Sequence, residues 1–218
     1  AWLSGYWDEA VSFFRSFFNA TFKTNPYLLR GLITGITRIS KESIFSDLNN
    51  LQVVTTTSEK YATSFGFTEE EVFRALDSVG LGTEKQGVKE WYDGFTFGSV
   101  RDIYNPWSII NFLDKNGEYS AYWADSSGNG LVNSLIKQGS ADMKQTMEQL
   151  LQGGSFDTEI DEQIVFNQLA RNENAVWSLL LATGYLRVEN VRRRGRLLKK
   201  CYTLRLTNME IESMFARM

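Results

Sequence analysis

The chain has 218 residues, of which 43% are hydrophobic and 14% aromatic, enough to bury one large core or two small ones. Its formal net charge of −3 gives the surface no general attraction for nucleic acid or an anionic membrane, so any such contact requires a local patch. The absence of histidine excludes Ser-His-Asp and Cys-His catalysis and His-bearing zinc sites, and the single cysteine, Cys201, excludes an internal disulfide and favours a reducing, cytoplasmic compartment.

The first 57 residues predict an alternation of helix, strand, helix and strand. Apolar residues at spacings of three and four predict a helix over 8–22, which ends before Pro26 because the residue preceding a proline disfavours helical backbone. An apolar run predicts a buried strand at 28–37, followed by a short helix at 41–48 and a second strand at 51–57. This order is typical of the final units of an α/β layer.

Residues 58–172 predict a mostly helical unit. Thr68 is expected to cap its first helix, and the acids Glu69 to Glu71 favour the positive end of the helix dipole, which explains them without a catalytic pair. A turn-rich hairpin is expected at 92–106, where aromatic rings are expected to form a small core: Trp91, Tyr92, Phe95, Phe97, Tyr104 and Trp107. The other elements are expected as helices at 84–92, from Pro106, at 129–137 and at 141–151, and as a weak strand at 156–160.

Residues 173–218 predict a different unit, in which an apolar helix ending at Gly184 precedes two alternating strands. A last helix follows, capped by Thr207 or Asn208. Helix, hairpin and helix in this order are compatible with a winged-helix element. The whole chain is therefore expected to be mainly α with short β elements, an α+β fold, in three parts at 1–57, 58–172 and 173–218.

One candidate site is an anion site after the first predicted strand, where Thr34, Arg38 and Lys41 combine a hydroxyl with two positive charges. In P-loop ATPases, polar and basic groups in such a place stabilise charge during phosphoryl transfer. A strand end and a helix end explain the same residues without any function. No G-x-x-x-x-G-K-[ST] motif occurs, so the chain alone is not expected to hydrolyse ATP, and no metal site is expected.

A second candidate is the basic tip, the turn of the predicted C-terminal hairpin. Its positive side chains could contact the phosphates of a nucleic acid, and the alternative is a solvated turn or a contact with an acidic domain. The basic tip consists of Arg192, Arg193, Arg194, Arg196, Lys199 and Lys200.

Eight segments together carry a resemblance to a known family: GYWDEAVSFFRSFFNATFKTNPYL, LITGITRISKESIFSDLNNL, FGFTEEEV, WYDGFTFG, IYNPWSIINFL, YWADSSGN, WSLLLATGYL and LTNMEI. In this order and spacing they resemble the predicted AAA-ATPase-like proteins of anaerobic and gut bacteria. The resemblance extends over essentially the whole chain. That family combines a P-loop ATPase core, a helical lid with a winged-helix-like end and, commonly, a PD-(D/E)xK nuclease-like domain.

The resemblance implies that the chain is the rear of the ATPase core and its lid, without the segment that bears Walker A and Walker B and without the nuclease-like domain. It implies that Thr34 and Arg38 act as a phosphate sensor, with Lys41 beside them. Contacts from the lid to ATP are expected at Tyr104, Asn105 and Pro106. ATP and Mg²⁺ are expected as ligands of the full-length protein, and no tightly bound group is expected on this chain.

The resemblance and the basic tip together imply the expected partners. They are the missing P-loop segment, the nuclease-like domain and, through the basic tip, nucleic acid. No stretch reaches the ~18 consecutive apolar residues that cross a bilayer, so no membrane contact is expected. A sheet without its first strands exposes an edge and an apolar face, which predicts dimerisation.

Overall fold

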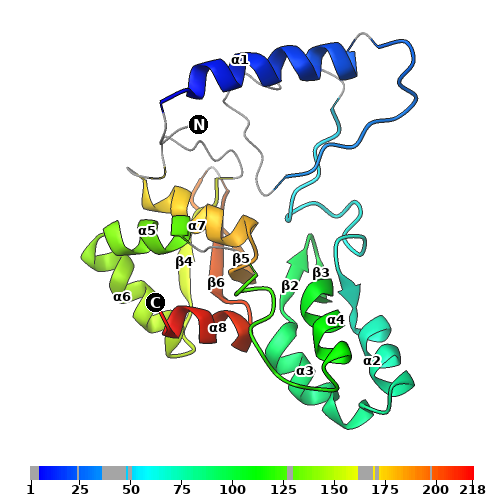
Figure 1. The fold of residues 1–218 in the computed structure, drawn as a ribbon. Coiled ribbons are helices and arrows are strands. Elements are labelled where there is room, and N and C mark those ends of the chain that lie inside the picture. The colour runs from blue at the N-terminus through cyan, green and yellow to red at the C-terminus, as the bar shows by residue number, and fades with distance from the viewer. Residues whose placement is uncertain are drawn as a thin grey trace.

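The computed structural model describes residues 5–23, 25–35, 48, 51–126, 130–161, 169, 172–196 and 198–218. The fold is mixed α/β, with helices around two separate antiparallel sheets of three strands each (Figure 1). This confirms the α+β class. None of the helices in these ranges combines the length and apolar character needed to cross a membrane.

The N-terminal segment begins with α1 (Trp7–Phe18), which continues into a π-helical turn (Asn19–Lys23). The predicted helix is therefore confirmed, although none of its residues is buried and Phe13 is 64% exposed. Figure 1 shows α1 at one end of the molecule, away from both sheets. The phenylalanines of α1 stack on one another along the helix at a spacing of four residues, Phe13 on Phe17 and Phe14 on Phe18.

The two predicted N-terminal strands are wrong within the described residues. Residues 25–35 and 51–57 contain no strand, and in the first of these segments Leu29 is 92% exposed and Leu32 87% exposed. An apolar run forms a stable strand only when a neighbouring strand pairs with it, and the described chain provides none there. The helix predicted at 41–48 lies outside the described residues except for Leu48.

The middle of the chain forms the helix-hairpin unit that the sequence predicts. Thr68 and Glu71 form a capping box on its first helix, and the Asn105 side chain accepts hydrogen bonds from the first turn of the helix that Pro106 opens. The strand order is β1-β3-β2, which makes β2 an edge strand. The elements are β1 (Phe67–Thr68), α2 (Glu69–Ser78), a 3₁₀ turn (Gly82–Glu84), α3 (Lys85–Tyr92), β2 (Phe95–Phe97), β3 (Val100–Tyr104) and α4 (Pro106–Asp114).

The C-terminal half builds the second sheet, in the order β4-β6-β5, so that β5 is an edge strand. The weakly predicted strand near residue 156 is the third strand of this sheet, antiparallel to β6. Strand β5 contains Arg192, Arg193 and Arg194, and strand β6 contains Lys199 and Lys200, so within the basic tip only Arg196 lies in the turn. The elements are α5 (Gly130–Gln138), α6 (Ala141–Leu151), β4 (Phe156–Thr158), α7 (Glu173–Ala182), β5 (Leu186–Arg194), β6 (Lys199–Leu206) and α8 (Met209–Ala216).

Two clusters of buried side chains stabilise the fold. The smaller lies between α2, α3 and α4 and is centred on Tyr92, Tyr104 and Phe112, and the larger joins α5, α6, α7 and α8 to the second sheet. Helices of the predicted 58–172 part and elements of the predicted 173–218 part therefore share the larger core. The clusters approach each other at residues 121–124, where Tyr122 belongs to the smaller and Ala124 to the larger.

The small aromatic core is confirmed for Trp91, Tyr92 and Tyr104, which lie in or against the smaller cluster. It is wrong for Trp107, which is 54% exposed because it lies on the outer side of α4. Phe95 and Phe97 are half-buried and lie elsewhere, on the wall of a groove between the two sheets.

Candidate functional site: a groove between two sheet edges

The edge strands of the two sheets, β2 and β5, lie side by side (Figure 1). The space around them contains two cavities, of about 220 Å³ and about 380 Å³. Both are lined by Thr56, Thr96, Leu181 and Val188, so they are neighbours along one groove. We call this feature the β2/β5 groove.

The smaller cavity of the β2/β5 groove has mostly apolar and aromatic walls. Rings line it from both sides of the junction, and a single charged side chain, Arg187 of β5, lies among them. Tyr104, Asn105 and Pro106, where β3 passes into α4, also lie on its wall. Its aromatic wall consists of Phe65, Phe95, Phe97, Tyr104 and Trp123.

The larger cavity is more polar. It is lined by two cations, Arg101 and Lys200, and by one carboxylate, Glu59, which accepts a hydrogen bond of 2.7 Å from Ser99 Oγ. With Arg187 of the smaller cavity, the groove carries three positive side chains against one negative among its described lining residues. The remaining polar groups that line the larger cavity are those of Thr56, Thr57, Thr96, Ser99, Asn190 and Tyr202.

Two glycines allow the segments around the groove to approach closely. Gly184, at the end of α7, has a φ of +85°, and a Cβ there would lie 2.5 Å from the ring of Phe95. Gly94 has a φ of +114°, and a Cβ there would lie 2.3 Å from the carbonyl oxygen of Thr207 and 2.9 Å from Arg187 Nη1. Each position combines a backbone conformation suited to glycine with a lack of space for a side chain.

Arg187 is half-buried, and two other arginines, Arg205 and Arg101, lie near it. Burial lowers the pKa of its guanidinium, and the nearby Arg205 lowers it further, while the charges of Asp93 and Glu189 oppose this. Glu189 already pairs with Arg205 at 3.0 Å. Arg187 lines the smaller cavity, and no hydrogen bond or ion pair joins it to another residue of the described chain.

Asp93 lies next to this region and is only 5% exposed. Burial raises its pKa to about 7, and the side chain of Asp102 adds to the rise, while a hydrogen bond from the Gly94 backbone opposes it. Its Oδ1 has no hydrogen-bond partner among the described atoms. Lys89 Nζ lies 3.6 Å from Asp102 Oδ1 and donates a hydrogen bond to Glu69. The hydrogen bond to Glu69 is the main reason that the pKa of Lys89 is raised.

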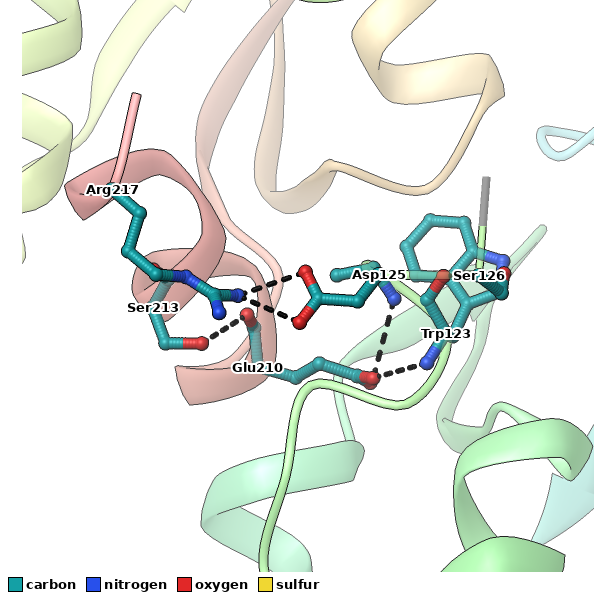
Figure 2. Close-up of polar contacts among 7 residues, drawn as sticks. Trp123, Asp125, Ser126, Glu210, Ser213 and Arg217 are labelled. Carbon is teal, nitrogen blue, oxygen red and sulfur yellow. Dashed lines mark hydrogen bonds and ion pairs between the residues drawn. The ribbon is translucent and has the colours of Figure 1, made fainter. Parts of the chain in front are cut away.

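The helix α8 is fixed beneath the junction by the fully buried Glu210 (Figure 2). Glu210 Oε1 accepts hydrogen bonds from the backbone N–H of Trp123 at 2.6 Å and of Ala124 at 3.4 Å. Close by, Arg217 donates to both carboxylate oxygens of Asp125, at 2.9 and 3.0 Å. These contacts hold Trp123, a wall of the smaller cavity, against α8.

The structure brings together only some of the predicted site residues. Thr34 is exposed in an irregular segment, and Arg38 and Lys41 lie outside the described residues, so the predicted sensor has no described arrangement. Tyr104, Asn105 and Pro106 lie together on the wall of the smaller cavity. Among the described residues, no three His, Cys, Asp or Glu side chains are grouped so that they could hold a metal ion.

The basic tip lies on the β5–β6 hairpin, and all its residues are exposed. Acids of the neighbouring β4 segment neutralise part of it: Arg194 pairs with Asp157 at 2.7 Å, and Lys199 with Glu159 at 3.5 Å. Arg193 lies across from Lys200 in the β5–β6 register, and Lys200 also lines the larger cavity. The tip therefore has both paired and unpaired cations.

Sequence reasoning missed the most informative groove residues. Arg187 is an isolated arginine in an alternating strand, and Arg101 is one polar residue of a short hairpin, so neither forms a motif. Trp123 and Thr56 are likewise separated from both by tens of residues. The sequence contains one local signal near the groove, the pair Asp93-Gly94. A turn explains this pair equally well, so it did not indicate a site.

Comparison with known proteins adds one relative. The chain is similar to an uncharacterized protein in the vnfD 5′ region of Azotobacter chroococcum mcd 1, at 22% identity over 199 residues. The similarity covers 91% of this chain and 36% of that protein, so the chain spans about a third of its relative's length. No family model matches the chain, and no solved structure matches it.

Proposed function

We propose that the chain is a nucleotide-binding module of an ATPase, which binds ATP in the β2/β5 groove. The observation that carries this proposal is that the three predicted parts of the chain meet there. Thr56 and Thr57 come from the predicted core part, Tyr104 to Pro106 from the predicted lid, and Arg187 from the predicted C-terminal element. A ligand in the groove would therefore touch all three parts at once.

The chemistry of the groove supports a nucleotide. An aromatic cavity suits the flat face of a base, and the adjoining cavity, with its cations and hydroxyls, suits phosphates. The two volumes, about 220 and about 380 Å³, together fall within the ≈ 300–1,000 Å³ typical of small-molecule sites. The resemblance to AAA-ATPase-like proteins favours ATP over other nucleotides.

In this proposal the chain binds ATP and responds to it, while hydrolysis depends on a P-loop that its sequence lacks. In this proposal residues 58–172 correspond to the helical lid and 173–218 to a winged-helix-like element. Residues 1–57 correspond to the tail of the P-loop core, although the two strands predicted for it do not form in the described residues. Closure of these parts around ATP would move an attached nuclease-like domain. Thr34, Arg38 and Lys41 would act on the γ-phosphate in the full-length protein. Among the described residues no group of three His, Cys, Asp or Glu side chains could hold a metal ion, so the ligands of Mg²⁺ in this proposal are chiefly the phosphates of ATP.

Calorimetric titration with Mg-ATP tests the proposal. We expect the 218-residue chain to bind Mg-ATP with modest affinity, because its sequence lacks a P-loop. Thr96→Trp should abolish this binding, because Thr96 lines both cavities and an indole would fill the groove. Thr83→Trp is the matched control, since Thr83 is exposed on the 3₁₀ turn and should leave binding unchanged. Equal affinity of the two variants would remove the groove as the nucleotide site.

A second candidate function is favoured by the unpaired cations of the basic tip. Arg193 and Arg196 are exposed and have no ion pair within the described chain, so they are available for phosphates of a nucleic acid. A winged-helix-like unit would present its hairpin in this way. This function does not depend on ATP. The two functions can therefore be tested separately.

A further inference from the structure

Arg187 is a cation in the smaller cavity of the β2/β5 groove without a protein partner. Its guanidinium has five N–H donors, and no residue of the described chain accepts a hydrogen bond from it. A half-buried guanidinium is costly to leave without acceptors. Something that is not a described side chain is therefore expected to accept from it.

The surroundings of Arg187 favour an anion as that acceptor. Arg205 and Arg101 lie close enough to repel its charge. Two carboxylates attract it, Asp93 and Glu189, but Glu189 already pairs with Arg205 at 3.0 Å. Within the described residues, Asp93 forms no hydrogen bond or ion pair with Arg187. Arg101 donates to the backbone carbonyl of Glu189 at 3.0 Å, which neutralises no charge. Three arginines thus share few negative groups, and a bound anion would relieve their repulsion.

The position of Arg187 also orients the ligand. It lies on the wall with Phe95 and Trp123, whereas Arg101 and Lys200 line the neighbouring polar cavity. If the flat ring of a ligand lies against the aromatic wall, Arg187 can bind an anionic group next to that ring. Arg101 and Lys200, in the neighbouring cavity, can then bind anionic groups further along the same ligand.

We infer that Arg187 binds the phosphate next to the base of the nucleotide, the α-phosphate, while Lys200 contacts the terminal phosphates. This inference rests on the proposed nucleotide function and names the residue that recognises the ligand as an anion. The shared chemistry is a flat ring joined through a short link to a phosphate. AMP, ADP and ATP all have it, and adenosine does not.

The position of Gly94 supports this assignment. A Cβ on Gly94 would lie 2.9 Å from Arg187 Nη1 and 2.3 Å from the Thr207 carbonyl oxygen. The glycine therefore gives the guanidinium room in the narrow junction between the two sheets. Any side chain at this position would displace Arg187 and alter the cavity.

The test is a calorimetric titration of the 218-residue chain with ATP, AMP, adenosine and pyrophosphate. We expect Arg187→Gln to lower the affinity for ATP and for AMP by the same factor, about 10- to 100-fold, the range that the loss of a hydrogen bond to a charged group gives. Adenosine should be unaffected. Lys200→Gln should weaken ATP more than AMP, and Arg187→Lys, which keeps the charge without the planar fork, should recover part of the affinity.

Two controls separate binding from folding. Thermal unfolding of each variant shows whether it folds, and Arg74→Gln, at an exposed arginine paired with Glu70 on α2, should leave all affinities unchanged. If Arg187→Gln unfolds, the comparison of Arg187→Lys with wild type still decides, because a phosphate contact predicts weaker AMP binding in a folded protein.

The outcomes distinguish this inference from the proposed function. ATP binding that Arg187→Gln leaves intact overturns the role of Arg187 and keeps the nucleotide site. Binding of pyrophosphate but of no nucleotide, lost in Arg187→Gln, keeps the anion role and overturns the nucleotide. If neither nucleotides nor pyrophosphate bind, both are overturned.

Discussion

Ser108 Oγ donates a hydrogen bond of 2.9 Å to Glu210 Oε2, and both side chains are fully buried. The two residues lie 102 positions apart, on α4 and α8. This contact joins the helix-hairpin unit to the C-terminal sheet unit at the level of the side chains. With the bonds from Trp123 and Ala124, it gives the buried carboxylate three donors.

The first prediction concerns this carboxylate. Glu210→Ala should lower the free energy of unfolding by about 2–5 kcal/mol, because it leaves the Ser108 hydroxyl and two backbone N–H groups buried without an acceptor. Chemical denaturation measures the loss. Glu212→Gln is the control, because Glu212 lies two residues further along α8 and is only half-buried, and it should change stability by less than about 0.5 kcal/mol. A similarly small loss in Glu210→Ala would show that the contact does not stabilise the junction.

The second prediction separates two roles of Asn208. Its Oδ1 accepts from Ile211 N–H and caps α8, while its Nδ2 donates to the Asp93 carbonyl at 2.8 Å. Asn208→Ala removes both and should cost about 2–3 kcal/mol, whereas Asn208→Asp keeps the cap and should cost less. The midpoint of thermal unfolding ranks the variants. Equal losses would mean that the cap carries no measurable part of the effect.

The third prediction concerns pH. The folded-state pKa of Asp93, about 7, lies above its ordinary value of 3.8, so the folded protein binds more protons than the unfolded chain between these values. The free energy of unfolding should therefore fall as pH rises from about 4 to about 7, by up to about 1.4 kcal/mol per pH unit from this group.

Asp93→Asn should remove that part of the pH dependence, and denaturation curves at several pH values check it. Asp142→Asn is the matched control, because Asp142 is exposed in the first turn of α6 and its replacement should leave the slope in place. An unchanged slope in Asp93→Asn would assign the pH dependence to other groups.

The fourth prediction concerns the basic tip. If nucleic acid binds there, Arg193→Gln should weaken binding and reduce the dependence of affinity on salt by about one phosphate contact. Arg194→Gln should have a smaller effect, because Arg194 already pairs with Asp157 at 2.7 Å. Fluorescence anisotropy at several salt concentrations distinguishes the two. Replacement of Arg192, Arg193 and Arg194 by Glu should abolish binding, and unchanged affinity would exclude this surface.

The sequence predicts the helices from residue 68 onward because their local signals agree with the fold. Thr68 and Glu71 cap α2, Pro106 opens α4, and the turn at Asp93-Gly94 starts the aromatic hairpin. The N-terminal strands fail because an apolar run such as 28–35 does not show whether a pairing strand exists. Pairing is a long-range property, and it overrides local preference there.

The groove could not be predicted for the same reason. Arg101 and Arg187 are 86 positions apart, 187 − 101, and meet only because two sheet edges pack together. Glu210 looks like any acid of a C-terminal helix next to Glu212, and only the fold shows that one is buried and the other is not. The lid contacts at Tyr104 to Pro106 came from the family resemblance, and their position on the groove is compatible with it.

The central claim is that nucleotide binds in the β2/β5 groove, and hydrogen exchange with and without Mg-ATP tests it most directly. The account predicts slower exchange at β2 (Phe95–Phe97) and from the end of α7 into β5, around Gly184 to Val188, with no change in α6. Thr96→Trp should remove this protection. Protection confined to the basic tip, or none at either sheet edge at saturating Mg-ATP, would contradict it.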